Sequence, residues 1–195
     1  MDTLTIASFD IGKHNFAYCI ERVDMNHRGA TFKDVCLNGT ITHLVKADLI
    51  PSEKNVDPAS TFFTFMDKNK TLWDGCNIFI IEQQIKANYY ALRLSYYLEA
   101  YLKLNYANFK MVSTFSPRSK TKLFEKHFMV PECGSKLVRK KLCIQQAKQI
   151  LMDRGDLKHL TMVNNEPKQD DLCDVICQLQ AYKWTKMVRT SNRPS

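Results

Sequence analysis

The sequence predicts an α/β protein in which a mixed five-stranded sheet carries helices on both faces. Short apolar and β-branched runs occur first as a group of three, and further runs then alternate with helical periodicities. The chain has 195 residues, 45% of them hydrophobic, which is enough to bury the core of one domain. A two-domain nucleotide clamp would need roughly twice this length. Six glycines and six prolines also argue against extensive disorder.

The first third of the chain is expected to supply three strands. Residues 4–11 are mostly apolar or β-branched, which is typical of a buried strand. Residues 16–23 follow closely enough to pair with it as a hairpin. Residues 31–44 contain threonine, valine and isoleucine and favour a third strand, which a turn at Asn38 and Gly39 would interrupt.

The middle of the chain is expected to add two helices and the central strand. A polar loop over residues 46–58 leads into a helix over residues 58–69. Residues 77–81 contain the longest purely apolar run of the chain, which indicates a strand at the centre of a sheet. Residues 88–106 then have the periodicity of a long helix.

The long helix has an apolar stripe along its length. Other apolar residues lie off the stripe, so the helix is apolar on more than one face. One face should cover the sheet, and the other should pack on its own chain or on a second subunit. Core packing is the more frequent explanation of such a stripe, and the alternative is that the stripe forms a dimer interface. Its members are Tyr90, Leu94, Tyr97, Tyr101 and Leu104.

The last part of the chain is expected to form a fifth strand followed by helices. The strand covers residues 109–115. Helices are predicted over residues 120–127 and 136–152, the second with Ser135 as its N-cap. A final helix should begin after Pro167 and end near residue 188.

The charge of the chain is strongly positive and unevenly distributed. The formal net charge is +8, from 28 lysines and arginines against 20 acidic residues. All of the excess lies after Tyr106, and much of it within residues 118–141. A localised basic patch favours a polyanion such as nucleic acid, whereas an evenly basic, solvated surface is the alternative. The candidate DNA-binding residues are Arg118, Lys120, Lys122, Lys136, Arg139 and Lys140.

The cysteines and the apolar runs indicate where such a protein would reside. The seven cysteines contain no C-x-x-C pair and have no matching histidine pair, which argues against a zinc site and favours buried, reduced thiols. No signal peptide is evident, and no apolar run is long enough to span a bilayer. We therefore expect a soluble, intracellular protein without a membrane partner. Residues 1–188 should form one domain and residues 189–195 a flexible tail.

Four carboxylates stand at positions that are unusual for surface acids. Asp10 interrupts a buried strand, and Glu82 directly follows the apolar run of the central strand. Asp171 and Asp174 are three residues apart at the start of a helix, so both point the same way. Each acid alone is explained by an ion pair, a cap or the helix dipole. Together they predict a site for a hard cation such as Mg²⁺.

A basic patch and a Mg²⁺ site in one chain favour a metal-dependent reaction on a phosphodiester. Two Mg²⁺ ions, with Mn²⁺ as a possible substitute, would offset the four carboxylates. One ion would lower the pKa of a bound water to make the nucleophile, and the other would stabilise the leaving oxygen. A lysine near the phosphate would stabilise the transition state, and Lys140 and Lys141 are the candidates.

Four short motifs carry a family resemblance. They are Phe9-Asp10-Ile11-Gly12-Lys13-His14-Asn15, Ile80-Ile81-Glu82-Gln83-Gln84, Arg139-Lys140-Lys141 and Asp170-Asp171-Leu172-Cys173-Asp174. In this order they resemble the motifs of poxvirus-type Holliday junction resolvases, of the RuvC-like branch of the ribonuclease H-like superfamily. The resemblance extends over about residues 3–188. The chain departs from the family at Val175, at Leu142 and in the long stretch between the first two motifs.

The resemblance implies a ribonuclease H-like fold and a homodimeric, Mg²⁺-dependent endonuclease that cuts four-way DNA junctions by paired, symmetric nicks. It implies that Lys141 is the active-site lysine. In a virus, such an enzyme would act where viral DNA replicates. The implied metal ligands are Asp10, Glu82, Asp171 and Asp174. Two alternatives stay open, a related nuclease for RNA/DNA hybrids or other branched DNA and a non-catalytic basic domain that binds nucleic acid.

Overall fold

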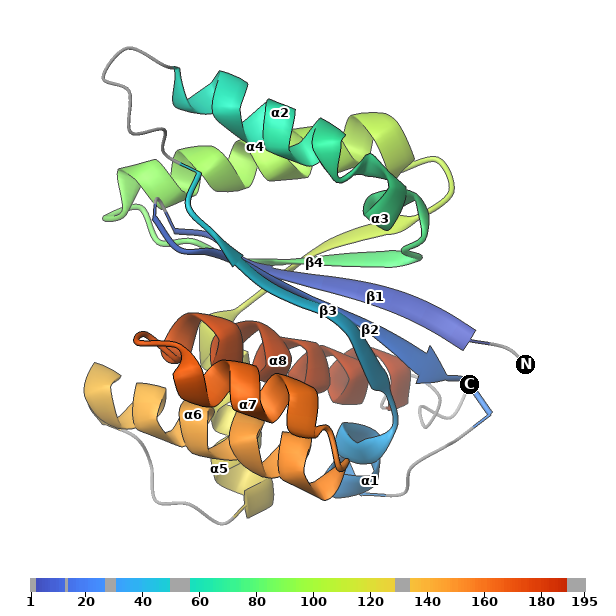
Figure 1. Cartoon of the computed structure of the whole chain (residues 1–195), viewed down its shortest axis with the longest axis vertical. Coiled ribbons are helices and arrows are strands. Elements are labelled where there is room, and N and C mark those ends of the chain that lie inside the picture. The colour runs from blue at the N-terminus through green and yellow to red at the C-terminus, as the bar shows by residue number, and fades with distance from the viewer. Residues whose placement is uncertain (1–2, 13, 27–30, 50–56, 129–133, 189–195) are drawn as a thin grey trace, which may run out of the picture.

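The computed structural model describes residues 3–12, 14–26, 31–49, 57–128 and 134–188, and these residues contain one five-stranded sheet (Figure 1). The second strand is antiparallel to both the first and the third, whereas the fourth strand runs parallel to the first and the fifth runs parallel to the fourth. The order across the sheet is β3-β2-β1-β4-β5. The predicted mixed five-stranded sheet is therefore confirmed. The strands are β1 (Thr3–Asp10), β2 (Phe16–Asp24), β3 (Thr40–Ala47), β4 (Ile78–Glu82) and β5 (Met111–Phe115).

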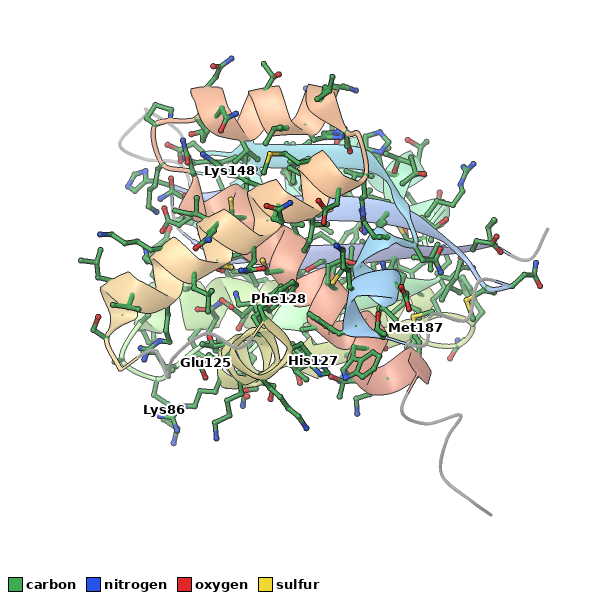
Figure 2. The ribbon with its side chains drawn as sticks, turned by 90° about the horizontal axis from the view of Figure 1, so that it is seen from below. Lys86, Glu125, His127, Phe128, Lys148 and Met187 are labelled. Carbon is green, nitrogen blue, oxygen red and sulfur yellow. The ribbon has the colours of Figure 1, made fainter. Side chains whose placement is uncertain are left out.

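Helices cover both faces of the sheet, as predicted, and each layer encloses its own hydrophobic core. Figure 1 shows one layer, which consists of α2 (Pro58–Lys68), α3 (Lys70–Asp74) and α4 (Tyr89–Tyr106). The opposite layer consists of α1 (Phe32–Leu37), α5 (Pro117–Phe128), α6 (Lys136–Asp153), α7 (Leu157–Asn165), α8 (Asp170–Tyr182) and a π-helical segment, Lys183–Val188. Figure 2 views this second layer from below, with His127 and Phe128 at the end of α5 and Lys148 on α6.

Strand β1 lies between the two cores because its side chains alternate between the faces of the sheet. Ile6 belongs to the core under α5–α8, whereas Phe9 belongs to the core under α2–α4. Both side chains are fully buried. The strand ends at Asp10, and its parallel neighbour β4 ends at Glu82. The topology therefore brings two carboxylates to the same edge of the sheet, where open α/β sheets bind their ligands.

Helix α8 is buried on nearly every side, because it packs between the sheet and helices α5 and α6. Gln178 Nε2 donates hydrogen bonds to Ser8 Oγ at 3.1 Å and to the Phe9 carbonyl at 3.2 Å. These bonds satisfy a buried amide and hold the helix on β1. Asp174 lies one turn before Gln178 on the same face of α8, so it points towards the strand ends.

A buried ionic network joins β2 to the C-terminal helices. Glu21 Oε2 lies 3.1 Å from Arg154 Nη1, and Glu21 Oε1 lies 2.5 Å from Lys183 Nζ. Burial alone would raise the pKa of Glu21, but Lys183 and Arg154 outweigh it and lower the pKa. Gly39 approaches this carboxylate with φ of +149°, and a Cβ there would lie 2.0 Å from Glu21 Oε1. Both the space and the backbone conformation therefore require glycine at this position.

The segment over residues 31–44 differs from the predicted strand. Its first part forms α1, and only its second part belongs to β3, which continues to Ala47. Thr31 and Asp34 make a capping box, in which each side chain accepts the other's backbone N–H. A helix of six residues is too short to produce a recognisable periodicity, so the pattern of β-branched residues was misleading.

The C-terminal third contains one helix more than predicted. Helix α7 begins after Asp156, whose side chain accepts the N–H of His159. The last helix begins where predicted, at Asp170, but its hydrogen bonding changes from α to π after Tyr182. Ser135 caps α6 as expected. The tail predicted over residues 189–195 lies outside the described residues.

Candidate active site

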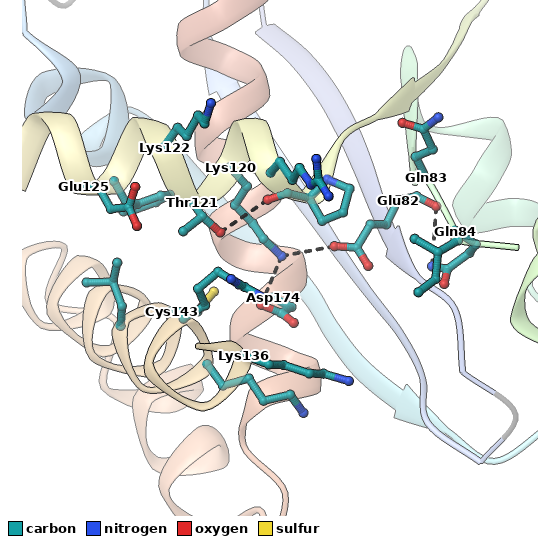
Figure 3. Close-up of a pocket in the computed structure, with 17 residues that line it drawn as sticks. Glu82, Gln83, Gln84, Lys120, Thr121, Lys122, Glu125, Lys136, Cys143 and Asp174 are labelled. Carbon is teal, nitrogen blue, oxygen red and sulfur yellow. Dashed lines mark hydrogen bonds and ion pairs between the residues drawn. The ribbon is translucent and has the colours of Figure 1, made fainter. Parts of the chain in front are cut away.

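The strand ends and α8 bring three of the four predicted acids around one lysine. Lys120 Nζ lies 3.2 Å from Glu82 Oε1 and 3.0 Å from Asp174 Oδ1 (Figure 3). Asp10 shares a hydrogen bond with Glu82 and interacts electrostatically with Asp174. The side chain of Lys120 is only 7% exposed. The centre thus combines carboxylates from β1, β4 and α8 with an ammonium from α5.

The position of Lys120 follows from the topology. Strand β5 is parallel to β4, and Phe115 at its end is level with Glu82. Pro117 ends the extended segment and begins α5, so the first turn of this helix lies beside Glu82. Lys120 is in this turn, because its N–H bonds to the carbonyl of Ser116.

Lys120 is one of the bases predicted to bind DNA, and the structure places it inside the acidic centre. Its ammonium is buried in the acidic centre, where desolvation is offset by two carboxylates. The sequence contains only part of the signal for this position, because the pairing of β4 with β5 that completes it comes from the structure. Lys120 follows the end of the strand next to Glu82 by one helical turn, and a base at such a place is directed to the same edge as the acids.

The charges in this centre shift one another's pKa values. Burial, followed by the charges of Glu82 and Asp174, raises the pKa of Asp10 well above its usual range, although Lys120 opposes this effect. Burial would lower the pKa of Lys120, but Asp174 and Glu82 outweigh it and raise the pKa. Lys120 is therefore a charged ammonium. The raised pKa of Asp10 favours its protonated form, which shares a hydrogen bond with Glu82.

The fourth predicted acid, Asp171, is paired with lysines beside this centre. Its Oδ1 lies 2.8 Å from Lys168 Nζ, and its Oδ2 lies 3.5 Å from Lys46 Nζ. The preceding residue, Asp170, forms an ion pair with Lys140, which lowers the pKa of Asp170 in spite of its burial. The structure thus separates Asp171 from the group around Lys120 and gives Asp170 a partner that sequence reasoning did not assign.

The carboxylate oxygens are chemically suited to bind a metal ion, but they are spaced too widely to coordinate one. Within the described ranges, no three histidine, cysteine, aspartate or glutamate side chains lie close enough together to hold a metal ion. Glu82 and Asp174 are spaced around an ammonium, at 3.2 and 3.0 Å from its nitrogen. Mg²⁺ binds oxygens at about 2.1 Å, so each carboxylate oxygen would have to move about 1 Å closer to an ion at the position of the nitrogen. Their oxygens are of the donor type that Mg²⁺ prefers.

A pocket of about 690 Å³ opens next to the acidic centre, between α5, α6 and the segment after β4. Figure 3 shows Glu82, Lys120 and Asp174 on its wall. Among the described residues, four of its bases are exposed, Lys140 is half-buried and Lys120 is buried. All six bases predicted to bind DNA line it: Arg118, Lys120, Lys122, Lys136, Arg139 and Lys140. By contrast, Lys141 is exposed and is not among the residues that line this pocket.

The stripe predicted as a dimer interface on α4 is largely a core face. Leu94 and Tyr101 are 2% and 7% exposed and pack against the sheet, so they cannot line a surface between subunits. Tyr90 and Tyr97 are half-buried, and only Leu104, at 86%, is well exposed. The prediction was wrong for the buried pair because a stripe with helical spacing marks the face towards the sheet before any other.

The opposite side of α4 carries a shallow exposed groove. Its volume is about 250 Å³. The residues that line it are Tyr89, Leu92, Arg93, Tyr96 and Tyr97. Tyr89 and Tyr96 are 72% and 60% exposed. The outer face of this helix therefore presents two large aromatic rings to solvent.

The cysteines in the described part of the chain are free thiols, and all six of them are buried. This agrees with the expectation of buried, reduced cysteines. Cys133 lies outside the described residues. None of the helices that the structure describes is long and apolar enough to cross a membrane.

Two viral proteins are similar to this chain over nearly its whole length. Uncharacterized protein 170L of Invertebrate iridescent virus 6 is 36% identical over 221 aligned positions, which cover 94% of this chain and 90% of that protein. Uncharacterized protein 97L of Invertebrate iridescent virus 3 is 31% identical, with coverage of 91% and 98%. No protein-family profile matches the chain.

The fold is that of RuvC-like Holliday junction resolvases. The yeast mitochondrial Holliday junction resolvase Ydc2 superposes with a TM-score of 0.61 at 14% identity, over 95% of this chain and 83% of that one. Thermus thermophilus RuvC gives 0.59 at 12% identity, over 92% and 95%. The same enzyme in complex with a Holliday junction substrate gives 0.59 at 13% identity, over 94% and 96%. These comparisons confirm the predicted ribonuclease H-like fold.

Proposed function

Because the chain belongs to one family with the iridescent-virus proteins 170L and 97L and has the fold of Holliday junction resolvases, we propose that it is a metal-dependent endonuclease that cuts four-way DNA junctions. One observation carries the proposal. The carboxylates of Asp10, Glu82 and Asp174 meet at the edge of a pocket lined by six basic side chains. This combination suits a nuclease, because the bases can bind a polyanion while the carboxylates hold a hard cation beside the bond that is cut.

Asp10, Glu82 and Asp174 would hold the metal, with Asp171 one turn of α8 away from Asp174 as a further ligand. The cofactor would be Mg²⁺, two ions per site, with Mn²⁺ able to replace it. When bound, it supplies Lewis-acid stabilisation and lowers the pKa of the attacking water. Asp171 would first have to leave Lys168 and Lys46, since both contact its carboxylate.

The bases around the pocket would bind and orient the DNA backbone. Lys136, Arg139 and Lys122 are exposed and lie on two helices that flank the acidic centre. Contacts with several phosphates would fix the position of the scissile strand without reading its sequence. The ammonium of Lys120 is the base nearest to the acids, so it would stabilise the negative charge that develops on the phosphate.

Paired, symmetric nicks would need two active sites. A four-way junction presents two equivalent strands, and a two-fold dimer presents two equivalent sites. We therefore propose a homodimer, for which the exposed aromatic groove on α4 is the surface available, in place of the buried part of the predicted stripe. In an iridescent virus, the enzyme would resolve branched DNA where viral DNA is replicated.

The test is nicking of a synthetic four-way junction in Mg²⁺. We expect wild-type protein to introduce paired nicks and Asp10→Asn to lose about a hundredfold or more in rate, because a metal ligand is removed. Asp24→Asn, on the exposed far end of β2, is the matched control and should keep full activity. Full activity of Asp10→Asn would contradict the assigned metal site.

The same assay separates the alternatives. An RNA/DNA hybrid, a flap and a four-way junction are offered in parallel. Preference for the hybrid or the flap would point to a different nuclease on this fold. Binding that weakens with salt, together with no turnover on any of these substrates in Mg²⁺ or Mn²⁺, would indicate a domain that only binds nucleic acid.

A further inference from the structure

Beside the acidic centre, one carboxylate lies between two lysines from different parts of the chain. Asp171 Oδ1 is 2.8 Å from Lys168 Nζ, and Asp171 Oδ2 is 3.5 Å from Lys46 Nζ. Lys46 is near the end of β3, whereas Lys168 precedes α8. Two ammonium groups that converge on one carboxylate form a binding site for an anion, which the chain fills with a group of its own.

Other partners also hold the two lysines of this anion site. Lys46 Nζ lies 2.6 Å from Glu166 Oε1. With its oxygen turned towards Lys168, the amide of Asn15 accepts a hydrogen bond from Lys168 Nζ at 3.1 Å. Neither contact involves Asp171, so the positions of the two ammonium groups do not depend on this carboxylate alone.

The carboxylate of Asp171 fills the anion site incompletely. Its side chain is 9% exposed, and among the described residues no donor makes a hydrogen bond to its Oδ2. The distance of 3.5 Å from Oδ2 to Lys46 Nζ allows ionic attraction but is longer than a good hydrogen bond. A buried acceptor without a donor is costly, so Asp171 is a replaceable occupant of the site.

The charges of the anion site match those of a phosphodiester. Lys46 and Lys168 supply two positive charges, and Glu166 and Asp171 supply two negative ones, so the four side chains together are neutral. Without the carboxylate of Asp171 the remaining three would have one positive charge, which one backbone phosphate would neutralise. The side chain of Lys168 is 45% exposed, so an anion can reach it from solvent.

The anion site is separate from the basic pocket but close to the acids. Neither Lys46 nor Lys168 lines the pocket, whose bases come from α5 and α6. Asp171 lies one turn of α8 before Asp174, which belongs to the acidic centre. A DNA strand that is bound along the pocket and passes the acids would therefore have a second point of attachment beside them.

We propose that Lys46 and Lys168 bind a phosphate of the DNA backbone, at a site that Asp171 occupies in the free protein and vacates when DNA binds. The inference rests on the proposed function, because it takes the anion to be nucleic acid. It deepens that function by assigning a phosphate contact outside the basic pocket, together with a carboxylate that competes for it. The loss of this acid should consequently tighten DNA binding, and the gain should depend on Lys168.

The first test measures the affinity for a four-way junction by fluorescence anisotropy in EDTA, so that no metal binds and no DNA is cut. Asp171→Asn should bind severalfold more tightly than wild type, and the slope of log K against log salt should steepen by about one. This gain should disappear when Lys168→Gln is added. It should persist when Lys158→Gln is added instead, because Lys158 is an exposed base on α7 away from the site.

Two results of this measurement would overturn the proposal. If Asp171→Asn gains the same affinity with and without Lys168, the gain is a general effect of removing a negative charge. If a folded Asp171→Asn protein binds the junction no more tightly than wild type, its carboxylate does not compete with DNA.

The second test detects the contact itself and includes the wild-type protein, whose folding is not in question. Wild type and Asp171→Asn are briefly acetylated in EDTA with and without the junction, and modification of each lysine is quantified by mass spectrometry. We expect DNA to protect Lys168 severalfold in both proteins and to leave Lys158 unchanged. Equal reactivity of Lys168 with and without bound DNA would contradict a phosphate contact at this position.

The outcomes also separate this inference from the proposed function. If DNA binds through Lys168 but no junction is cut in Mg²⁺ or Mn²⁺, the anion site stands and the nuclease proposal fails. If junctions are cut while Lys168 shows neither coupling to Asp171 nor protection by DNA, only the anion site fails. If neither wild type nor any variant binds DNA, both fail.

Discussion

Two buried lysines show how differently this chain uses the same side chain. Lys183 is 1% exposed, and its ammonium is held by Glu21 Oε1, Gln180 Oε1 and the Asn38 carbonyl. These partners surround it inside the protein, and Lys183 lines neither the pocket beside the acidic centre nor the groove on α4. Lys120 is equally buried by its acids but borders a pocket. The first arrangement joins β2 to the C-terminal helices, and the second places a charge at the edge of a pocket.

The network around Glu21 gives a prediction for stability. Glu21→Gln would leave Arg154 and Lys183 buried without their counter-charge, and we expect the free energy of unfolding at neutral pH to fall by about 3 kcal/mol. Urea denaturation followed by circular dichroism measures this loss. Glu99→Gln, which removes only a surface pair with Lys103, is the control and should cost less than about 0.5 kcal/mol.

The same variant has a defined dependence on pH. The pKa of Glu21 is lowered from its ordinary value of 4.5, because Lys183 and Arg154 outweigh its burial. The stabilisation by its charge is therefore complete above about pH 4.5 and is lost as the pH falls through the lower pKa of the folded state. The difference in stability between wild type and Glu21→Gln should narrow in acid. A difference that stays constant down to pH 3 would contradict the role of the charge.

At the residue scale, the acids could be predicted and the lysine could not. Asp10 and Glu82 end apolar strands, so their unusual positions are visible in the sequence. In the sequence, nothing distinguishes Lys120 from the other bases of the patch. Its burial depends on the pairing of β4 with β5, which no local sequence pattern predicts. Asp171 was placed with the metal ligands by motif, whereas its lysine partner Lys46 comes from a strand far away in the sequence.

At the scale of elements, helices α5 and α6 supply the basic wall of the pocket, whereas the acids come from β1, β4 and α8. The boundaries of α4, α6 and the start of α8 could be predicted, because caps and long apolar periods are local signals. Helix α1 could not, because six residues show no period. The change to π hydrogen bonding after Tyr182 also has no local signal in the sequence.

The basic wall gives a prediction for DNA binding. Lys136→Ala and Arg139→Ala should each weaken junction binding and reduce the slope of log K against log salt by about one. Both residues are exposed and line the pocket. The measurement is fluorescence anisotropy across a salt series. Lys158→Ala, an exposed base on α7 that does not line the pocket, is the control, and an equal loss in that variant would show that only the overall charge matters.

At the scale of the whole molecule, the layered architecture could be predicted from the order of the elements. The hairpin of β1 and β2 and the single helix α4 between β4 and β5 leave few ways to arrange five strands. What the pattern could not give was which face of α4 is free. Leu94 and Tyr101 of the regular stripe pack against the sheet, whereas Tyr89 and Tyr96 are exposed on the outer face.

The outer face of α4 gives a prediction for assembly. We expect the mass of two chains in solution by light scattering at micromolar concentration. Tyr96→Glu places a charge in the aromatic groove and should shift the mass to that of one chain. Leu157→Glu, an exposed apolar residue at the start of α7, is the control and should leave the mass unchanged. A single-chain mass for the wild type would argue against the proposed homodimer.

The amide of Gln178 fixes the position of α8 along the edge of the sheet that carries the acids. If α8 slid by one residue, its side chains would shift by about 1.5 Å and rotate by roughly 100°. That movement would remove the bonds from Gln178 to Ser8 and Phe9 and would cost about 1–3 kcal/mol for an unsatisfied buried group. Asp174, one turn away on α8, is thus held in register with the ends of β1 and β4.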